Sequence, residues 1–126
     1  MYPFISKNIQ AKNWRWLLVV MGLGFALNLQ ASLSGKYTIN QKASASSTNY
    51  KSFSALAADL SYGTRTDSFT ANGPNISGTV EIDVVKGSGP YAEQVEFNAI
   101  LGASSSQTIT LNGNGEILTF NTNYTQ

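Results

Sequence analysis

The stretch TVEIDVV, at residues 79–85, is the feature that most constrains the fold of this chain. Three apolar side chains alternate with the carboxylates of Glu81 and Asp83, and an alternation with a period of two is typical of a strand with one buried face. The segment therefore predicts a half-buried strand over about 79–85, with inward side chains at Val80, Ile82 and Val84.

Shorter segments of the same kind precede and follow this strand. In the later ones apolar side chains alternate with polar ones, and Gly, Ser and Asn residues separate the segments. The inward positions are Val95 and Phe97, Ile109 and Leu111, and Leu118 and Phe120. The sequence predicts further strands at about 36–39, 93–98, 107–111 and 116–121, and therefore a mainly β domain.

One segment has the period of a helix instead. In SFSALAADLSYG the apolar residues recur at intervals of three and four, which places them on one helix face. Ser52 is a residue type that commonly caps a helix N-terminus, and Gly63 suits the position just after a helix C-terminus. We predict one helix over about 52–62, with an apolar face made of Phe53, Leu56, Ala57 and Leu60.

The segment LNGNGE, between the last two predicted strands, leaves the topology open. An Asn-Gly turn tolerates positive φ and is common in two-residue β-hairpins, which would favour a small antiparallel β-sandwich. Gly and Asn serve the same backbone geometry at a corner between successive strands of a parallel β-helix. Local chemistry does not distinguish these two folds.

The first 31 residues have the features of a secretory signal peptide. Basic residues precede an uncharged apolar run at 16–27, and Ala31 provides the small residue before a cleavage site. We predict a signal peptide at 1–31, a mature domain at 32–126 and a secreted or cell-surface location, with the membrane contacted only through the export signal. The alternative is an N-terminal membrane anchor, although the run is shorter than the roughly 20 residues of a spanning helix.

The chain contains neither cysteine nor histidine. This excludes a disulfide framework, thiolate chemistry, Cys-based metal sites and every Ser-His-Asp arrangement. It also fits an exported bacterial protein better than a small disulfide-rich animal module. The basic residues beyond Ala31 are scattered and form no nucleic-acid surface: Lys36, Lys42, Lys51, Arg65 and Lys86. We predict no catalytic, cofactor-binding or metal-binding residues, and no nucleic-acid partner.

Two groups of residues are candidates for ligand contact. Glu81 and Asp83 share one strand face and resemble a carboxylate pair, but the alternation favours a solvated face. Aromatic residues outside the apolar pattern form the other group, because sugars stack on exposed rings. We predict Tyr50, Tyr62 and Phe69 as candidate sugar contacts, with a polysaccharide as the partner.

The stretch KGSGPYAEQVEF, at 86–97, joins a turn to the start of a strand. Gly and Pro are the residues that most often shape such turns. We predict a structural turn formed by Gly87, Gly89 and Pro90, with Tyr91 as its packing or hydrogen-bonding anchor and Glu93 at the start of the next strand.

The order of these elements is LSGKYTIN, SFSALAADL, NISGTVEIDVVKGSGPYAEQVEF and SSSQTITLNGNG. It resembles the N-terminal region of right-handed parallel β-helix proteins of the pectin-lyase-like superfamily, in the pectinesterase-like form found in exported surface proteins of Bacteroidetes-type bacteria. In that region an opening strand leads into a capping helix, and a later strand ends in a Gly-x-Tyr-x-Glu turn, here at 89–93. The resemblance implies a mainly β fold in which one capping helix precedes the first coils of a β-helix.

The resemblance also implies a function. The catalytic aspartates of pectinesterase-like enzymes lie on a later coil, beyond residue 126, and neither Asp59 nor Asp83 matches them. We expect an exported, non-catalytic β-helix module or fragment of a larger surface protein, related to glycan binding or adhesion. The alternatives are a truncated remnant of a pectinesterase- or lyase-type enzyme and a small carbohydrate-binding β-domain. An open C-terminal end would pair with continuation β-strands or with a second copy of the chain.

Overall fold

The computed structural model describes residues 31–120 of the chain. Apart from Ala31, the predicted signal peptide at 1–31 lies outside these residues, as does the end of the strand predicted at 116–121. Within residues 31–120, no helix combines the length and hydropathy needed to cross a bilayer.

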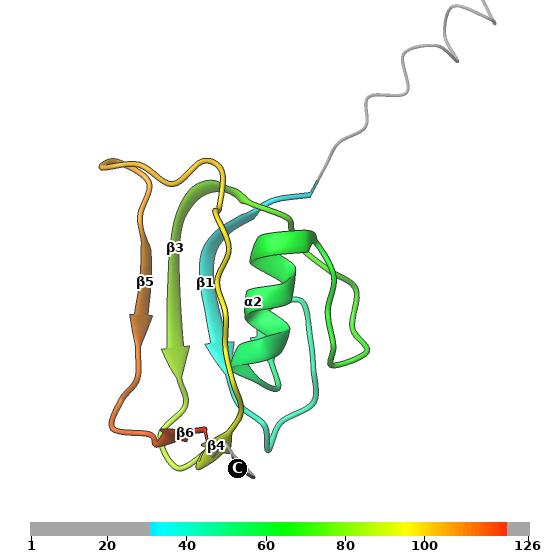
Figure 1. Ribbon diagram of the computed structural model, residues 1–126, viewed down its shortest axis with the longest axis vertical. Helices are drawn as coiled ribbons and strands as arrows, with labels where there is room; N and C mark the ends of the chain where they lie inside the picture. The colour runs from blue at the N-terminus through cyan, green and yellow to red at the C-terminus, as the bar shows by residue number, and fades with distance from the viewer. Residues whose placement is uncertain (1–30, 121–126) are drawn as a thin grey trace, which may run out of the picture.

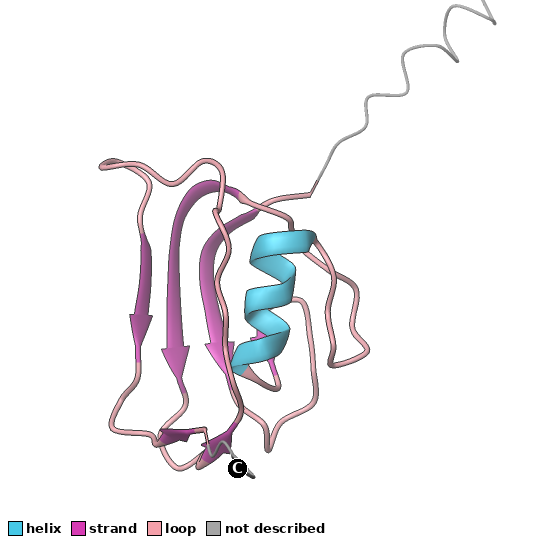
Figure 2. Cartoon of the chain, in the orientation of Figure 1, coloured by secondary structure: helices cyan, strands magenta, loops and turns pink. Residues whose placement is uncertain are grey.

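Within the described residues the chain is mainly β, with one helix, as predicted (Figure 2). The helix α2 begins at Phe53, next to the predicted Ser52 cap, whose hydroxyl accepts the Ala55 N–H at 3.0 Å. It ends before Gly63, which has the left-handed φ of 66°. In chain order the elements are β1 (Leu33–Ile39), β2 (Asn49–Tyr50), α2 (Phe53–Tyr62), β3 (Ile76–Val84), β4 (Tyr91–Ala92), β5 (Ile109–Asn112) and β6 (Leu118–Thr119).

The strands form two sheets in which every described pair is parallel. One sheet has the order β2-β1-β3-β5, and the other pairs β4 with β6 (Figure 1). The antiparallel β-sandwich is therefore wrong. Because β5 and β6 belong to different sheets, LNGNGE is a corner and not a hairpin, with positive φ at Asn114 and Gly115.

After β3 and β4 the chain returns to the same two sheets in β5 and β6. Asp83 on β3 lies opposite Asn112 on β5, 29 positions later. Tyr91 on β4 lies opposite Leu118 on β6, after a similar interval. The sequence contains a weak trace of this return, since TVEID at 79–83 is followed by TITLN at 108–112.

Two strand predictions need correction. The segment before the helix, where no strand was predicted, contains β2, which extends the sheet beyond β1. The strand predicted at 93–98 is not formed. This segment instead runs beside α2 (Figure 1): the Ser54 hydroxyl lies 3.4 Å from the Gln94 carbonyl, and the Asn98 N–H lies 3.3 Å from the Ser61 hydroxyl. The Glu93 N–H still donates to the Thr119 carbonyl of β6, but beyond it the segment lies beside the helix, which has no free backbone ladder to offer, and it does not pair as a strand.

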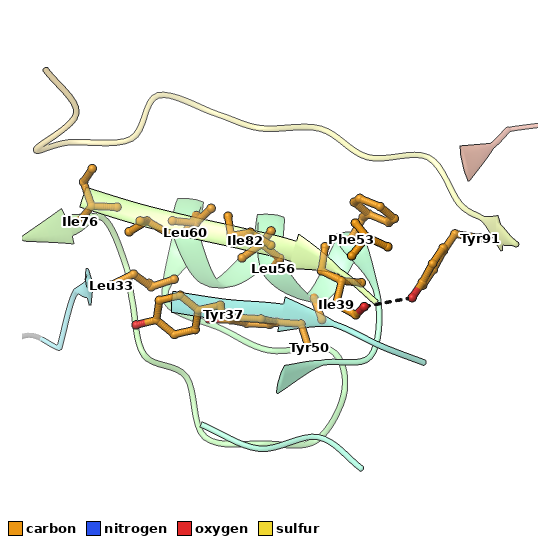
Figure 3. Close-up of a cluster of buried hydrophobic side chains, with 13 residues drawn as sticks. Leu33, Tyr37, Ile39, Tyr50, Phe53, Leu56, Leu60, Ile76, Ile82 and Tyr91 are labelled. Carbon is orange, nitrogen blue, oxygen red and sulfur yellow. Dashed lines mark hydrogen bonds between the residues drawn. The ribbon is translucent and has the colours of Figure 1, made fainter. Parts of the chain in front are cut away.

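The core lies between the sheet and α2 (Figure 3). The inward residues predicted for β3, namely Val80, Ile82 and Val84, are all buried. So are Phe53, Leu56 and Leu60 on the helix. Burial of these side chains supplies the main force that holds α2 against the sheet.

Candidate functional site

The predicted structural turn at 87–93 is fixed to the core through Tyr91. Its side chain is buried, and its ring meets the Phe53 ring edge-on with 5.0 Å between centroids. Its hydroxyl lies 2.7 Å from the Ser88 hydroxyl and donates to the Ile39 carbonyl at 3.3 Å (Figure 3). Tyr91 therefore has the contacts expected of a packing and hydrogen-bonding anchor, and its buried hydroxyl is not accessible to a ligand.

Glu93 follows the turn but does not begin a strand. Its carboxylate accepts the backbone N–H groups of Phe53 and Ser54, each at 2.9 Å, and also the Ser54 hydroxyl. These N–H groups belong to the first turn of α2, where the helix dipole favours a negative charge. Glu93 thus connects the turn to the helix.

Sequence reasoning missed Glu116, whose side chain binds the backbone of the same turn. Its carboxylate accepts the N–H of Gly87 and, at 2.6 Å, that of Gly89. These two hydrogen bonds, helped by the charges of Lys42 and Lys86, lower the pKa of Glu116. The sequence feature that could have indicated this role is the position of Glu116 directly after the Asn-Gly corner, 27 residues beyond Gly89.

A buried ion pair covers the outer edge of β2. The Arg65 side chain is fully buried and donates at 2.7 Å to the carbonyls of Ser46 and Asn49. It pairs with Asp67 at 2.6 Å and lies 4.0 Å above the Tyr50 ring. Burial opposes ionisation of Asp67, but hydrogen bonds from Arg65 and from the backbone outweigh it and lower the pKa of Asp67.

A second buried carboxylate, Asp59, lies on the inner side of α2. It accepts the Tyr50 hydroxyl at 2.8 Å and the N–H groups of Asn72 and Gly73 at 2.9 and 2.6 Å. Burial and the neighbouring Asp59 carboxylate raise the pKa of Tyr50. Every buried side-chain polar atom in the described part of the chain has a partner, so this network is satisfied from within the protein.

The candidate sugar contacts do not form one group. Tyr50 is fully buried, so its ring cannot stack on a sugar, and that prediction needs correction. Tyr62 and Phe69 are 65% and 40% exposed. The Tyr62 hydroxyl contacts the Asn98 amide, and Phe69 lies 5.2 Å from the Arg65 guanidinium.

The acidic pair on β3 is divided between two partners. Glu81 forms an exposed ion pair with Lys36 at 3.2 Å, and Asp83 accepts the Asn112 amide at 2.8 Å. These contacts link neighbouring strands across the polar face of the sheet. No three acidic side chains gather as a metal-ligand set within residues 31–120.

The free edge at β5 and β6 is the most unusual surface. Leu111 is in register with the buried Ile82, and Leu118 with the buried Tyr91, yet they are 43% and 47% exposed. The prediction that Leu111 and Leu118 point to the interior side of their strands fits this register, but neither is covered. Phe97 and Phe120, also predicted inward, are likewise exposed.

No family model, curated protein or solved structure matches this chain. We call the surface formed by Ile109, Leu111, Ile117, Leu118 and Phe120 the open end.

Proposed function

We propose that the chain is a non-catalytic structural module of an exported, pectin-lyase-like right-handed β-helix protein. In this role α2 closes the first turn of the stack, and the open end receives a further layer of parallel strands. The observation that carries the proposal is the exposure of Leu111 and Leu118 at positions whose neighbours in register, Ile82 and Tyr91, are buried. Repeat folds bury such positions only when the next repeat stacks on them.

The ties between successive passages of the chain support the same role. Glu116 binds the N–H groups of the preceding turn, and the Asn114 amide donates at 2.8 Å to the Val84 carbonyl. Asp83 and Asn112 pair at equivalent positions of β3 and β5. Side chains of one layer thus bind the backbone and side chains of the layer before it, as stacking requires.

An added layer tests this role. A full-length variant carries a second copy of residues 93–120 inserted directly after Phe120. We expect slower amide hydrogen exchange at Ile109 and Leu111, and a rise in the free energy of unfolding of about 1 kcal/mol for each half-exposed leucine that becomes buried. The matched control has the same insertion with aspartate in place of the copied Leu111 and Leu118. Equal exchange in the wild-type, inserted and control proteins would rule out the stacking role.

Glycan binding is a second candidate, favoured by the exposed rings of Tyr62 and Phe69. Binding to polygalacturonate would be lost on Tyr62→Ala or Phe69→Ala and kept on Phe97→Ala, which removes an exposed ring elsewhere. Descent from a pectinesterase- or lyase-type enzyme is a third reading of the resemblance. It predicts no turnover of pectin, because no residue of this sequence matches a catalytic position of those enzymes.

A further inference from the structure

The two edge strands of the four-stranded sheet, β2 and β5, differ in whether side chains occupy their outward backbone groups. At the β2 end the Asn49 carbonyl, which points away from β1, accepts a hydrogen bond from Arg65. The Lys51 N–H donates to Asp67 at 3.1 Å. Backbone groups that would recruit another strand are therefore occupied by side chains, a common protection of sheet edges.

The β5 edge lacks this protection in the described part of the chain. The Val80 N–H donates to the Thr108 carbonyl, so alternate residues of β5 bond to β3. In a parallel ladder the intervening residues, Ile109 and Leu111, point their N–H and C=O groups to the other side. From Phe97 to Phe120 the sequence has one charged residue, Glu116, and its carboxylate is directed back to the 87–89 turn.

We propose that two copies of the chain pair through their open ends, with β5 of one copy antiparallel to β5 of the other. This inference rests on the proposal above that the open end is a surface that receives strands, and it names a second copy of the chain, in place of a further layer, as the partner. A chain with one protected end and one unprotected end offers a single adhesive face, and such a face closes around a two-fold axis as a dimer. The surface is apolar in both copies, and the one charged side chain within residues 97–120, Glu116, is directed back to the 87–89 turn.

The two-fold axis also fixes the register. Ile109 lies opposite Leu111 of the second copy, so all outward backbone groups of β5 are paired. Thr110 then lies opposite the second Thr110 as a non-hydrogen-bonded pair, with Cα atoms about 4.5 Å apart. That separation is within the range of about 4.4–6.8 Å that a disulfide spans.

A cysteine pair tests this geometry in the full-length chain, which has no cysteine of its own. Under mild oxidation at micromolar concentration, Thr110→Cys should form a disulfide-linked dimer in most of the protein. The matched control is Thr79→Cys, an exposed threonine on the same sheet face one strand inward. It should cross-link at least tenfold less. Adding Leu111→Asp to Thr110→Cys should reduce the cross-link to the control level.

Equal cross-linking of Thr110→Cys and Thr79→Cys, or none in either, would overturn the dimer. If the inserted-layer variant still protects Ile109 and Leu111 from exchange in that case, the stacking role stands and only the partner is wrong. If the insertion gives no protection while Thr110→Cys cross-links, the open end serves the second copy and not a further layer. Native circular dichroism of both cysteine variants excludes loss of folding as the cause.

Discussion

The Glu93 carboxylate accepts the backbone N–H of Ser54, 39 positions earlier in the chain, at 2.9 Å. Its second oxygen accepts the Phe53 N–H at the same distance. This contact joins the turn after β3 to the first turn of α2. The position of the helix therefore depends on a residue that directly follows β4.

Removal of this carboxylate should loosen the helix. We expect Glu93→Ala to lower the free energy of unfolding by about 1–3 kcal/mol, because two helix N–H groups lose a charged acceptor. Glu93→Gln, which keeps one acceptor oxygen, should cost less. Urea denaturation measures the change, and Glu96→Ala at an exposed position is the control. Equal effects at both positions would contradict the role of Glu93.

The contact of Glu116 with the 87–89 turn should depend on pH. Since the pKa is lowered in the folded protein from its ordinary value of 4.5, the stabilisation is complete above pH 4.5 and is lost as pH falls through the lowered pKa. The protection of the Thr119 amide, meaning its exchange rate relative to the intrinsic rate at the same pH, should therefore fall in acid. In Glu116→Gln this acid-dependent step should disappear, and in Glu96→Gln it should remain.

Of the charged residues compared here, Arg65 should be the one whose replacement lowers the free energy of unfolding most. Arg65→Ala removes the guanidinium donor from the buried Asp67 carboxylate and from the carbonyls of Ser46 and Asn49, which should cost about 3–5 kcal/mol. Arg65→Lys should rescue little, because an ammonium cannot match the planar fork of the guanidinium. Lys36→Ala breaks the exposed pair with Glu81 and should cost less than about 1 kcal/mol by thermal denaturation. A similar loss at both positions would refute the edge-covering role.

The effect of truncating an apolar side chain should depend on whether the helix and the sheet cover it. Leu60→Ala should cost about 2–5 kcal/mol, because the side chain is fully buried between helix and sheet. Leu101→Ala, 70% exposed, should stay within about 0.5 kcal/mol. Chemical denaturation of the two variants side by side provides the comparison. A large loss at Leu101 would mean that this part of the surface is covered in solution.

Local pattern was a good guide where one segment carries its own signal. The period of β3, the caps of α2 and the Gly-Pro turn follow from side-chain spacing and backbone preference alone. The strand at 93–98 failed because alternation reports which side chains are apolar and not which backbone lies alongside. Likewise Tyr50, which lies outside the apolar pattern, is buried because Asp59 and Arg65 contact it. These residues come from later segments, and no local pattern predicts that they meet Tyr50.

The sequence by itself determined the mainly β character of residues 31–120, the helix at 53–62 and its caps, because these depend on neighbours a few residues apart. Only the tertiary structure decided that the strands are parallel, that Glu93 binds the start of α2 while Glu116 binds the 87–89 turn, and that Leu111 and Leu118 are uncovered. The physical reason is distance along the chain. Hydrogen bonds and burial between segments that lie 27 to 40 residues apart depend on how the chain returns past itself, and no local preference encodes that path.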